Sequence, residues 1–351
     1  MDFKKFYIEK AIYPAMTLLQ HNRVTVHTRN LLASERLDPA QRAADLRFRV
    51  SELLFLCRDN VPAYSDLPFT ELELRREALD CMQAVDPMPL ADFLAQAPEF
   101  LCRDADPDQL MHASYSPNAN LQAELYYSQG QVEQYEAARW RGLSWYGVTY
   151  GSPSVLLWDR PREPFFLREE PYMKNRLHLP VCAMTDKSVQ PTLEEIDRFS
   201  PEYISGSAEA LAILADGMEH TGLRLQTQLK VVTVTRGVAN GQLRRRITEL
   251  FGCPVAQTLG MRTEGLVAFM CPEGRLHVTA ENCFAEILDP RTLDPVPAGK
   301  TGLLAVTDLV GTVMPHLRVV LDFMAELSDE PCPCGRTLPV LKHLQTTTPG
   351  I

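Results

Sequence analysis

The most constraining feature of this 351-residue sequence is an alternation of strand-like and helical segments in its second half. Residues 229–235 (LKVVTVT) form a short run rich in β-branched side chains, and residues 242–251 follow it with apolar residues at helical spacing. A second short apolar run comes at residues 254–256. Strands separated by helices of about ten to fifteen residues predict a parallel sheet that is covered by helices.

The other segments extend this pattern. We expect helices within residues 1–60 and at 70–85, 132–146, 194–199 and 208–220, with strands at 154–158 and 203–204. Beyond Gly260, strand candidates at 276–278, 283–288, 302–307 and 314–319 follow one another with little helix between them. This change predicts a smaller, mostly antiparallel β subdomain that packs on an α/β parallel-sheet core. The expected parts are a helical part (1–100), the α/β core (101–265) and the β-rich subdomain (266–351).

Composition limits the partners and the location of the chain. The formal net charge is −10, which argues against binding to nucleic acid or to an anionic membrane. The compact basic cluster at residues 244–246 lies among apolar residues at helical spacing, which predicts a solvated helix face. The N-terminus has no signal-peptide pattern, and no apolar run approaches the roughly 20 residues that cross a bilayer. We therefore expect a soluble, cytoplasmic protein.

Cysteine and histidine spacing gives the sharpest local signal. The chain has nine cysteines and no export signal, so we expect reduced thiols or metal ligands instead of a disulfide framework. Cys271 and His277 form a Cys-x5-His pair, and Cys332 and Cys334 form a Cys-x-Cys pair. These ligand types suit a tetrahedral structural zinc, although separate buried thiols are the usual alternative. The close Cys332–Cys334 pair favours zinc, with no open coordination position.

Three ordered motifs occupy residues 229–265, 271–290 and 299–336. The first is a strand, turn, helix and strand that lead into LGMRTE, residues 259–264; the second is CPEGRLH followed by an acidic strand; the third ends in CPCGR. Together they resemble the phenylacetate-coenzyme A ligase branch of the adenylate-forming superfamily, including its Tyr-Gly-x-Thr-Glu box and its Cys-x-Cys-Gly-Arg element. Weaker similarity begins at residues 61–67. The resemblance covers most of the chain and implies the large N-terminal domain of an adenylate-forming enzyme.

That family activates a carboxylate with ATP to an acyl-adenylate and then passes the acyl group to a thiol. The resemblance implies a phosphate loop rich in glycine and hydroxyl groups, because only glycine lets backbone N–H groups approach phosphate oxygens closely. It also implies a metal-binding carboxylate in the box, here Glu264, and a ribose-binding aspartate, here Asp322. A lysine from a small C-terminal domain stabilises charge on the reacting carboxylate.

The sequence departs from this family pattern at four places. SYSPNAN, residues 114–120, occupies the position of the phosphate loop but contains no glycine, and Pro117 removes a donor N–H. Leu259 replaces the box tyrosine, and Asp322 lacks its preceding glycine. The chain ends roughly where the family's C-terminal domain begins, so we expect the lid domain and its lysine to be absent. These departures predict that the scaffold binds an acyl group without using ATP or Mg²⁺.

Three functions fit this pattern. The main interpretation is a protein that binds an acyl or aryl-acyl thioester, on coenzyme A or a carrier protein, and catalyses ATP-independent acyl transfer, condensation or hydrolysis. Such a role suits secondary metabolism. The first alternative is an ATP-dependent ligase with an unusual phosphate loop and a separate C-terminal partner. The second is a non-catalytic scaffold or regulatory subunit. The family's tendency to pair also makes a homodimer reasonable.

Candidate site residues follow from the motifs. Arg262 is the candidate oxyanion stabiliser, with an ordinary surface arginine as the alternative. His112 is a candidate base, or a surface or capping histidine. Asp322 is either a ligand group or a partner of Arg318, four residues earlier. The complete set is Arg262, Glu264 and His112 as catalytic residues; Thr263, Gly260, Gly237 and Asp322 as substrate-binding residues; and Cys271, His277, Cys332 and Cys334 as metal ligands.

Overall fold

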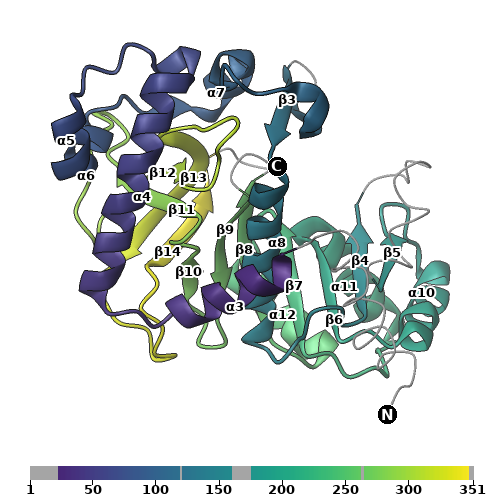
Figure 1. The fold of residues 1–351 in the computed structure, drawn as a ribbon. Coiled ribbons are helices and arrows are strands. Elements are labelled where there is room, and N and C mark those ends of the chain that lie inside the picture. The colour runs from purple at the N-terminus through teal and green to yellow at the C-terminus, as the bar shows by residue number, and fades with distance from the viewer. Residues whose placement is uncertain (1–22, 119–120, 160–174, 262–264, 348–351) are drawn as a thin grey trace.

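The computed structural model describes residues 23–118, 121–159, 175–261 and 265–347 (Figure 1). Within these described residues, five neighbouring strands run parallel to one another. They are β4 (Ser154–Trp158), β5 (Arg176–Pro180), β6 (Tyr203–Ser207), β7 (Val231–Arg236) and β8 (Val255–Met261). The predicted parallel-sheet core is therefore confirmed.

The strands that follow are antiparallel and belong to the same sheet. They are β9 (Gly265–Met270), β10 (Leu276–Val278), β11 (Cys283–Leu288), β12 (Thr301–Asp308), β13 (Val319–Ser328) and β14 (Val340–Thr346). The order is β11-β12-β13-β14-β10-β9-β8-β7-β6-β4-β5, and the short β1 (Met88–Pro89) pairs with β13. Because β8 pairs with β9, the antiparallel strands extend the parallel sheet. The expected combination of a parallel-sheet core with a mostly antiparallel β region is therefore confirmed, and the two parts share one sheet.

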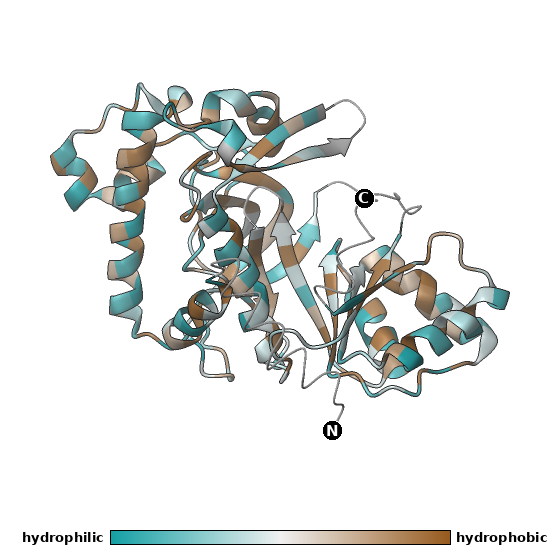
Figure 2. Cartoon of the chain, turned by 45° about the vertical axis from the view of Figure 1, so that its right-hand side comes forward, coloured by the Kyte–Doolittle hydropathy of each residue, from teal (hydrophilic) through white to brown (hydrophobic). Residues whose placement is uncertain are grey.

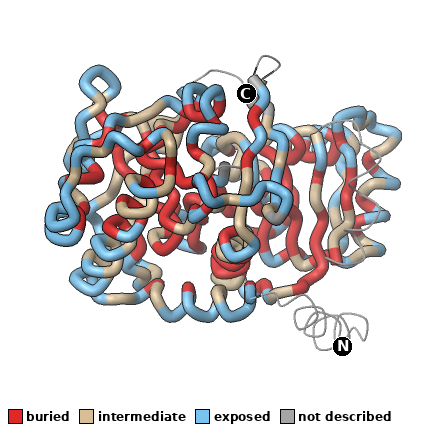
Figure 3. Tube along the Cα trace, turned by 45° about the horizontal axis from the view of Figure 1, so that its top comes forward, coloured by how far each residue is buried: buried red, intermediate tan, exposed pale blue. Residues whose placement is uncertain are grey.

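Helices cover both parts of the sheet. Along the chain they are α3 (Val24–Ser34), α4 (Pro39–Asn60), α5 (Glu71–Arg76), α6 (Ala78–Gln83), α7 (Leu90–Ala95), α8 (Gln129–Ser144), α10 (Asp186–Phe199), α11 (Ala208–Thr221) and α12 (Gly241–Phe251). Apolar residues concentrate along the central strands (Figure 2), and buried positions run through the middle of the molecule while exposed ones follow the outer helices (Figure 3). Within the described residues, no helix is both long and apolar enough to cross a bilayer.

Two hydrophobic clusters lie under these helices. One joins α10, α11 and α12 to the parallel strands, and the other joins the N-terminal helices and α8 to the antiparallel strands. Helix α12 shows why the sequence folds this way locally. Asn240 caps its N-terminus, Ile247 and Leu250 face the core, and Gly252 ends it with a φ of 66°. The domain boundaries at residues 100 and 265 remain predictions.

Two predicted elements differ from the structure. Residues 314–318 are not a strand, because Pro315 has no N–H for a ladder and Arg318 has a φ of 49°; β13 begins only at Val319. The helix expected at 70–85 is divided into α5 and α6 at Glu77, whose φ is −127°. The basic cluster at 244–246 does lie on helix α12, where Arg246 binds Asp216 and Glu219 of α11.

Candidate functional site

The SYSPNAN segment forms one strand of a hairpin. β2 (Met111–Asn118) pairs antiparallel with β3 (Leu121–Tyr127), with Ser114 opposite Glu124. Residues 119–120 lie outside the described residues. The interpretation of this segment as a loop is therefore wrong up to Asn118. The physical reason lies in β3, where Ala123 and Leu125 alternate with exposed positions and are buried in the core, which fixes a strand pattern.

His112 lies on the same hairpin and is exposed. It is opposite Tyr126 in the strand register, and the two ring centroids are 6.2 Å apart. Gln122 Nε2 donates a hydrogen bond of 2.9 Å to Ser114 Oγ. The role of His112 as a base remains a prediction, and its exposure leaves it accessible to a substrate.

The carboxyl ends of three parallel strands bring a charged cluster together. Asp159 directly follows β4, and Ser207 and Arg236 are the last residues of β6 and β7. Ser207 Oγ donates a hydrogen bond of 2.6 Å to Asp159 Oδ2, and the Arg236 guanidinium pairs with the same carboxylate. Burial opposes ionisation, but Ser207 and Arg236 hold the pKa of Asp159 below its ordinary value. Open α/β sheets bind ligands at this edge.

Gly237 lies in the turn after β7, at the same edge, with a φ of 72° that favours glycine. The buried Gln257 of β8 holds the turn. Its Oε1 accepts from the Ala239 N–H at 2.9 Å, and its Nε2 donates to the Gly237 carbonyl at 3.0 Å. The structure therefore places Gly237 beside the Asp159–Arg236 cluster, and its contact with a substrate remains a prediction.

The first three residues of the box that carries most of the predicted chemistry, 259–261, are the last residues of β8. Arg262, Thr263 and Glu264 are outside the described residues, whereas Gly260 pairs with Leu266 in the strand register. Gly265 has a φ of 62°, and a Cβ there would lie 2.2 Å from the Tyr135 ring. This contact fixes the start of β9 against helix α8.

A buried carboxylate binds the hydroxyl group of Tyr135. Asp308, at the end of β12, accepts a hydrogen bond from Tyr135 Oη. Gln131 Nε2 donates to the same carboxylate oxygen at 2.9 Å, and the Val310 N–H donates to the other at 3.0 Å. This carboxylate connects helix α8 to the end of β12, and the Tyr135 ring in turn contacts Gly265 at the start of β9.

Asp322 is exposed on β13, and its role as a ligand group remains a prediction. Its alternative role as a partner of Arg318 is wrong. Arg318 is buried, and its Nε lies 3.1 Å from Glu286 Oε2, while its Nη1 donates to the carbonyls of Gln83 and Val85. A spacing of four residues brings side chains together on a helix, but on an extended chain it spans about 13 Å.

The four predicted metal ligands meet at one place. The ligand atoms of Cys271, His277, Cys332 and Cys334 all lie within 4.8 Å of one another. The Cys271 and Cys332 sulfurs are 3.8 Å apart, and Cys334 Sγ is 3.3 Å from His277 Nε2. These are the spacings expected for donors at about 2.0–2.3 Å from a tetrahedral centre. The cluster could therefore hold a metal ion.

The groups around the cluster orient the His277 ring and lower its pKa. Its Nδ1 lies 3.2 Å from the Leu338 carbonyl, so that Nδ1–H donates and Nε2 faces the cysteines. Burial lowers the pKa of His277 to about 4, which keeps the imidazole neutral at neutral pH. Despite burial, the backbone and side chain of Arg336 hold the pKa of Cys334 below its ordinary value.

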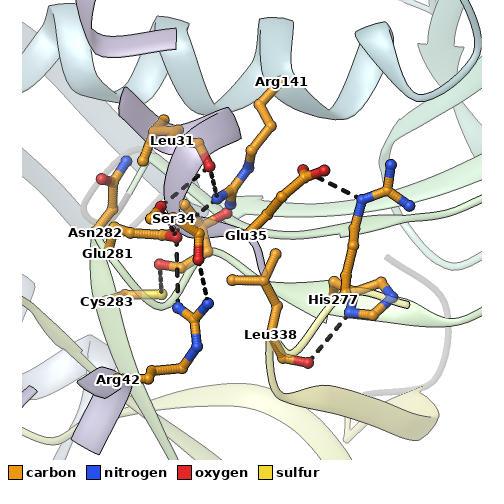
Figure 4. A network of polar contacts seen from close by, with 12 residues as sticks. Leu31, Ser34, Glu35, Arg42, Arg141, His277, Glu281, Asn282, Cys283 and Leu338 are labelled. Atoms are coloured by element: carbon orange, nitrogen blue, oxygen red, sulfur yellow. Dashed lines mark hydrogen bonds and ion pairs between the residues drawn. The ribbon is translucent and has the colours of Figure 1, made fainter. Parts of the chain in front are cut away.

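A polar network connects this cluster to the N-terminal helices (Figure 4). Glu35, next to the end of α3, accepts a hydrogen bond of 2.9 Å from Trp145 Nε1, and Arg336 Nε lies 3.2 Å from the same carboxylate oxygen. The Arg336 guanidinium also stacks over the Trp145 ring, 4.3 Å from its centroid. The Cys-Gly-Arg turn is thereby fixed against α3 and α8.

Five residues described above are not among the site residues predicted from the sequence: Asp159, Ser207, Arg236, Gln257 and Asp308. A usable signal existed for Asp159 and Arg236, since each is a polar residue that directly follows a predicted strand. Ser207 lies three residues beyond the strand expected at 203–204. Gln257 and Asp308 gave no such signal, because their roles depend on which segments pack against them.

Comparison with known proteins agrees with this architecture. No protein-family model matches the chain. The chain is 29% identical over 148 residues to the phenylacetate-coenzyme A ligase of Thermus thermophilus, a match that covers 40% of this chain and 33% of that relative. The matched segment thus spans about a third of the relative's length.

Two crystal structures of 2-hydroxyisobutyryl-CoA ligase are similar in fold. The open conformation, in complex with 2-HIB-AMP and CoA, has a TM-score of 0.71 at 16% identity and covers 88% of this chain and 75% of that chain. The thioesterification state has a TM-score of 0.72 at 16% identity, with coverages of 88% and 68%. The chain is accordingly similar in sequence to a phenylacetate-coenzyme A ligase over part of its length, and it has the fold of the 2-hydroxyisobutyryl-CoA ligase structures.

Proposed function

We propose that this protein binds an acyl or aryl-acyl thioester at the carboxyl edge of its parallel sheet and acts on it without ATP. The observation that carries the proposal is the glycine-free strand at the position of the phosphate loop. A phosphate cradle needs backbone N–H groups that converge on the oxygens, and an extended strand directs them alternately to opposite sides. The exposed Glu124 carboxylate opposite Ser114 also opposes a triphosphate.

The proposed chemistry needs no separate activation step. In a thioester, the carbonyl carbon already carries a thiolate leaving group, so an acceptor nucleophile forms the new bond while the C–S bond breaks and the thiol leaves with a proton. Arg262 is the proposed cation that stabilises the oxyanion, and His112 the proposed base that takes the proton from the acceptor. Thr263, Glu264 and Gly260 line the substrate site in this proposal.

An ATP-dependent ligase is the second candidate, and a specific observation favours it. The similar structures are of a CoA ligase bound to 2-HIB-AMP and CoA, and the sequence relative is also a CoA ligase. The Thr-Glu pair of the box is retained at Thr263 and Glu264. In this case Glu264 would provide the metal-binding carboxylate and Asp322 would bind the ribose.

One experiment separates the two candidates. The full chain is incubated with phenylacetyl-CoA and water or an amine acceptor, and free thiol is titrated; in parallel, carboxylate-dependent exchange of pyrophosphate into ATP is measured. We expect thiol release that Arg262→Met abolishes, and no exchange. Exchange that depends on added phenylacetate and is lost in Glu264→Gln would overturn the proposal in favour of the ligase. Neither activity with any acyl-CoA would overturn it in favour of a scaffold.

We propose further that Cys271, His277, Cys332 and Cys334 hold one structural zinc ion. Three thiols and one imidazole match the preference of zinc, and they occupy four coordination positions. The ligands come from the β9–β10 turn, from β10 and from the segment before β14, so the ion would join three parts of the antiparallel sheet. Its role in this proposal is to stabilise the fold and not to bind substrate.

A further inference from the structure

We propose that Arg236 is a specificity residue that binds a free carboxylate on the acyl group, so that the preferred substrates are thioesters of dicarboxylic acids. The inference rests on the proposed function, because it assumes that the acyl group binds at the carboxyl edge of the parallel sheet. It goes beyond that function by naming the residue that selects the acyl group and the chemical class that it selects.

The first argument is the contrast in burial within the Asp159–Arg236 pair. The Asp159 side chain is 5% exposed, whereas the Arg236 side chain is 51% exposed. Asp159 Oδ2 accepts from Ser207 Oγ and from Arg236 Nη2. A guanidinium has five N–H donors in a planar fork, so one nitrogen can be anchored by Asp159 while the others remain available to a second carboxylate.

The second argument is electrostatic. Helix α11 begins directly after Ser207, which caps it by accepting from the Ala210 N–H at 3.0 Å. Helix α12 begins after the turn that follows Arg236. Each helix N-terminus carries about half a positive charge. The charge of Arg236 offsets that of Asp159, and Glu209 in the first turn of α11 offsets the N-terminal charge of that helix. Helix α12 has no acidic residue in its first turn, so its N-terminus remains as the positive feature that favours an anion at this edge.

An ordinary surface ion pair does not account for this arrangement. Arg75 and Glu71 form such a pair on helix α5, and their side chains are 59% and 66% exposed. In the cluster the carboxylate is buried and hydrogen-bonded to a capping serine, so it fixes the position of the guanidinium. A fixed guanidinium loses less conformational freedom when it binds a carboxylate.

The test uses a matched pair of probes. Glutaryl-CoA and butyryl-CoA differ only by a terminal carboxylate, and their affinities for the full chain are measured by calorimetry. We expect the wild-type protein to bind glutaryl-CoA at least about tenfold more tightly, as a charge-assisted bidentate contact predicts. Arg236→Met should remove this preference, while Arg236→Lys should retain part of it.

Separate control experiments test whether the variant folds and whether the proposed function holds. If Arg236→Met unfolds, the double variant Asp159→Asn/Arg236→Met, which leaves no buried charge unpaired, replaces it. Equal affinities in the wild type, or a preference that survives Arg236→Met, would overturn the inference. If neither thioester nor phenylacetyl-CoA binds, the proposed function fails, and free glutarate then decides the inference: binding of glutarate that is lost in Arg236→Met supports it, and no such loss overturns it.

Discussion

Arg141 Nη1 donates a hydrogen bond of 2.8 Å to Glu281 Oε2, and the two side chains are 1% and 8% exposed (Figure 4). Arg141 belongs to helix α8, and Glu281 lies between β10 and β11. Ser34 Oγ donates to the other carboxylate oxygen at 2.6 Å, and Arg42 Nη1 lies 3.5 Å from it. A single carboxylate therefore joins α3, α4, α8 and the antiparallel strands.

Replacing this carboxylate should destabilise the protein strongly. Glu281→Gln leaves Arg141 charged and buried without a counter-ion, and breaking a buried pair in this way costs about 3–5 kcal/mol of the free energy of unfolding. Urea denaturation followed by circular dichroism measures the loss. Glu71→Gln, which breaks the exposed pair with Arg75, is the matched control and should change stability by less than about 0.5 kcal/mol. Similar losses in both variants would contradict the structural role of Glu281.

The same pair predicts a pH dependence. Burial opposes ionisation, but Arg141 and Ser34 hold the pKa of Glu281 below its ordinary value of 4.5. Because the folded-state pKa is lower than the unfolded one, the unfolded state binds more protons, and the contribution of Glu281 to stability is present above pH 4.5 and is lost as the pH falls through the folded-state pKa. The difference in unfolding free energy between wild type and Glu281→Gln should therefore shrink on acidification. A difference that stays constant from neutral to acid pH would rule out this linkage.

Much of the fold was predictable because the relevant signals are local. The strand expected at 154–158 is present with these bounds, and the strand expected at 203–204 lies within the longer β6. The failures have non-local causes. Residues 114–118 were assigned to a loop from their place in a family motif, although their pairing with β3 makes them a strand. Residues 314–318 are apolar enough for a strand, but the left-handed backbone of Arg318 excludes it.

The residues of the candidate site also divide into those with a local sequence signal and those that depend on the packing of distant segments. The Cys/His set was predictable from two short spacings, and the pairing of Leu276 with Leu341 explains how segments about 60 residues apart meet. Arg236 and Asp159 were missed because they become neighbours only when β4, β6 and β7 lie side by side, in an order that single segments do not reveal. A rule on polar residues at strand ends would have found them.

Two glycines of helix α8 should respond oppositely to alanine. A Cβ at Gly142 would lie 2.2 Å from the Phe269 ring on β9, so Gly142→Ala forces the helix away from the sheet and should cost at least about 1–3 kcal/mol. Gly130 in the same helix has nothing within 4 Å of such a Cβ. Gly130→Ala should therefore be neutral or stabilise by up to about 1 kcal/mol, since alanine favours helix. Thermal and urea unfolding of both variants check the sign; a stable Gly142→Ala would contradict the close packing of α8 on β9.

Zinc content tests the Cys/His cluster. Elemental analysis of the purified chain should give about one equivalent of zinc, and Cys332→Ser should reduce it below half an equivalent, because three donors bind zinc less tightly than four. Cys253→Ser is the matched control, since Cys253 is also buried but is not part of the cluster, and it should keep the metal. A strong chelator should lower the melting temperature of the wild type and of Cys253→Ser, and change that of Cys332→Ser much less, because the energy of metal binding contributes to folding. Two results together would contradict the zinc site: less than half an equivalent of zinc in the wild type, and a melting temperature that the chelator does not change. These residues would then be four separate side chains, whose close approach reflects packing alone.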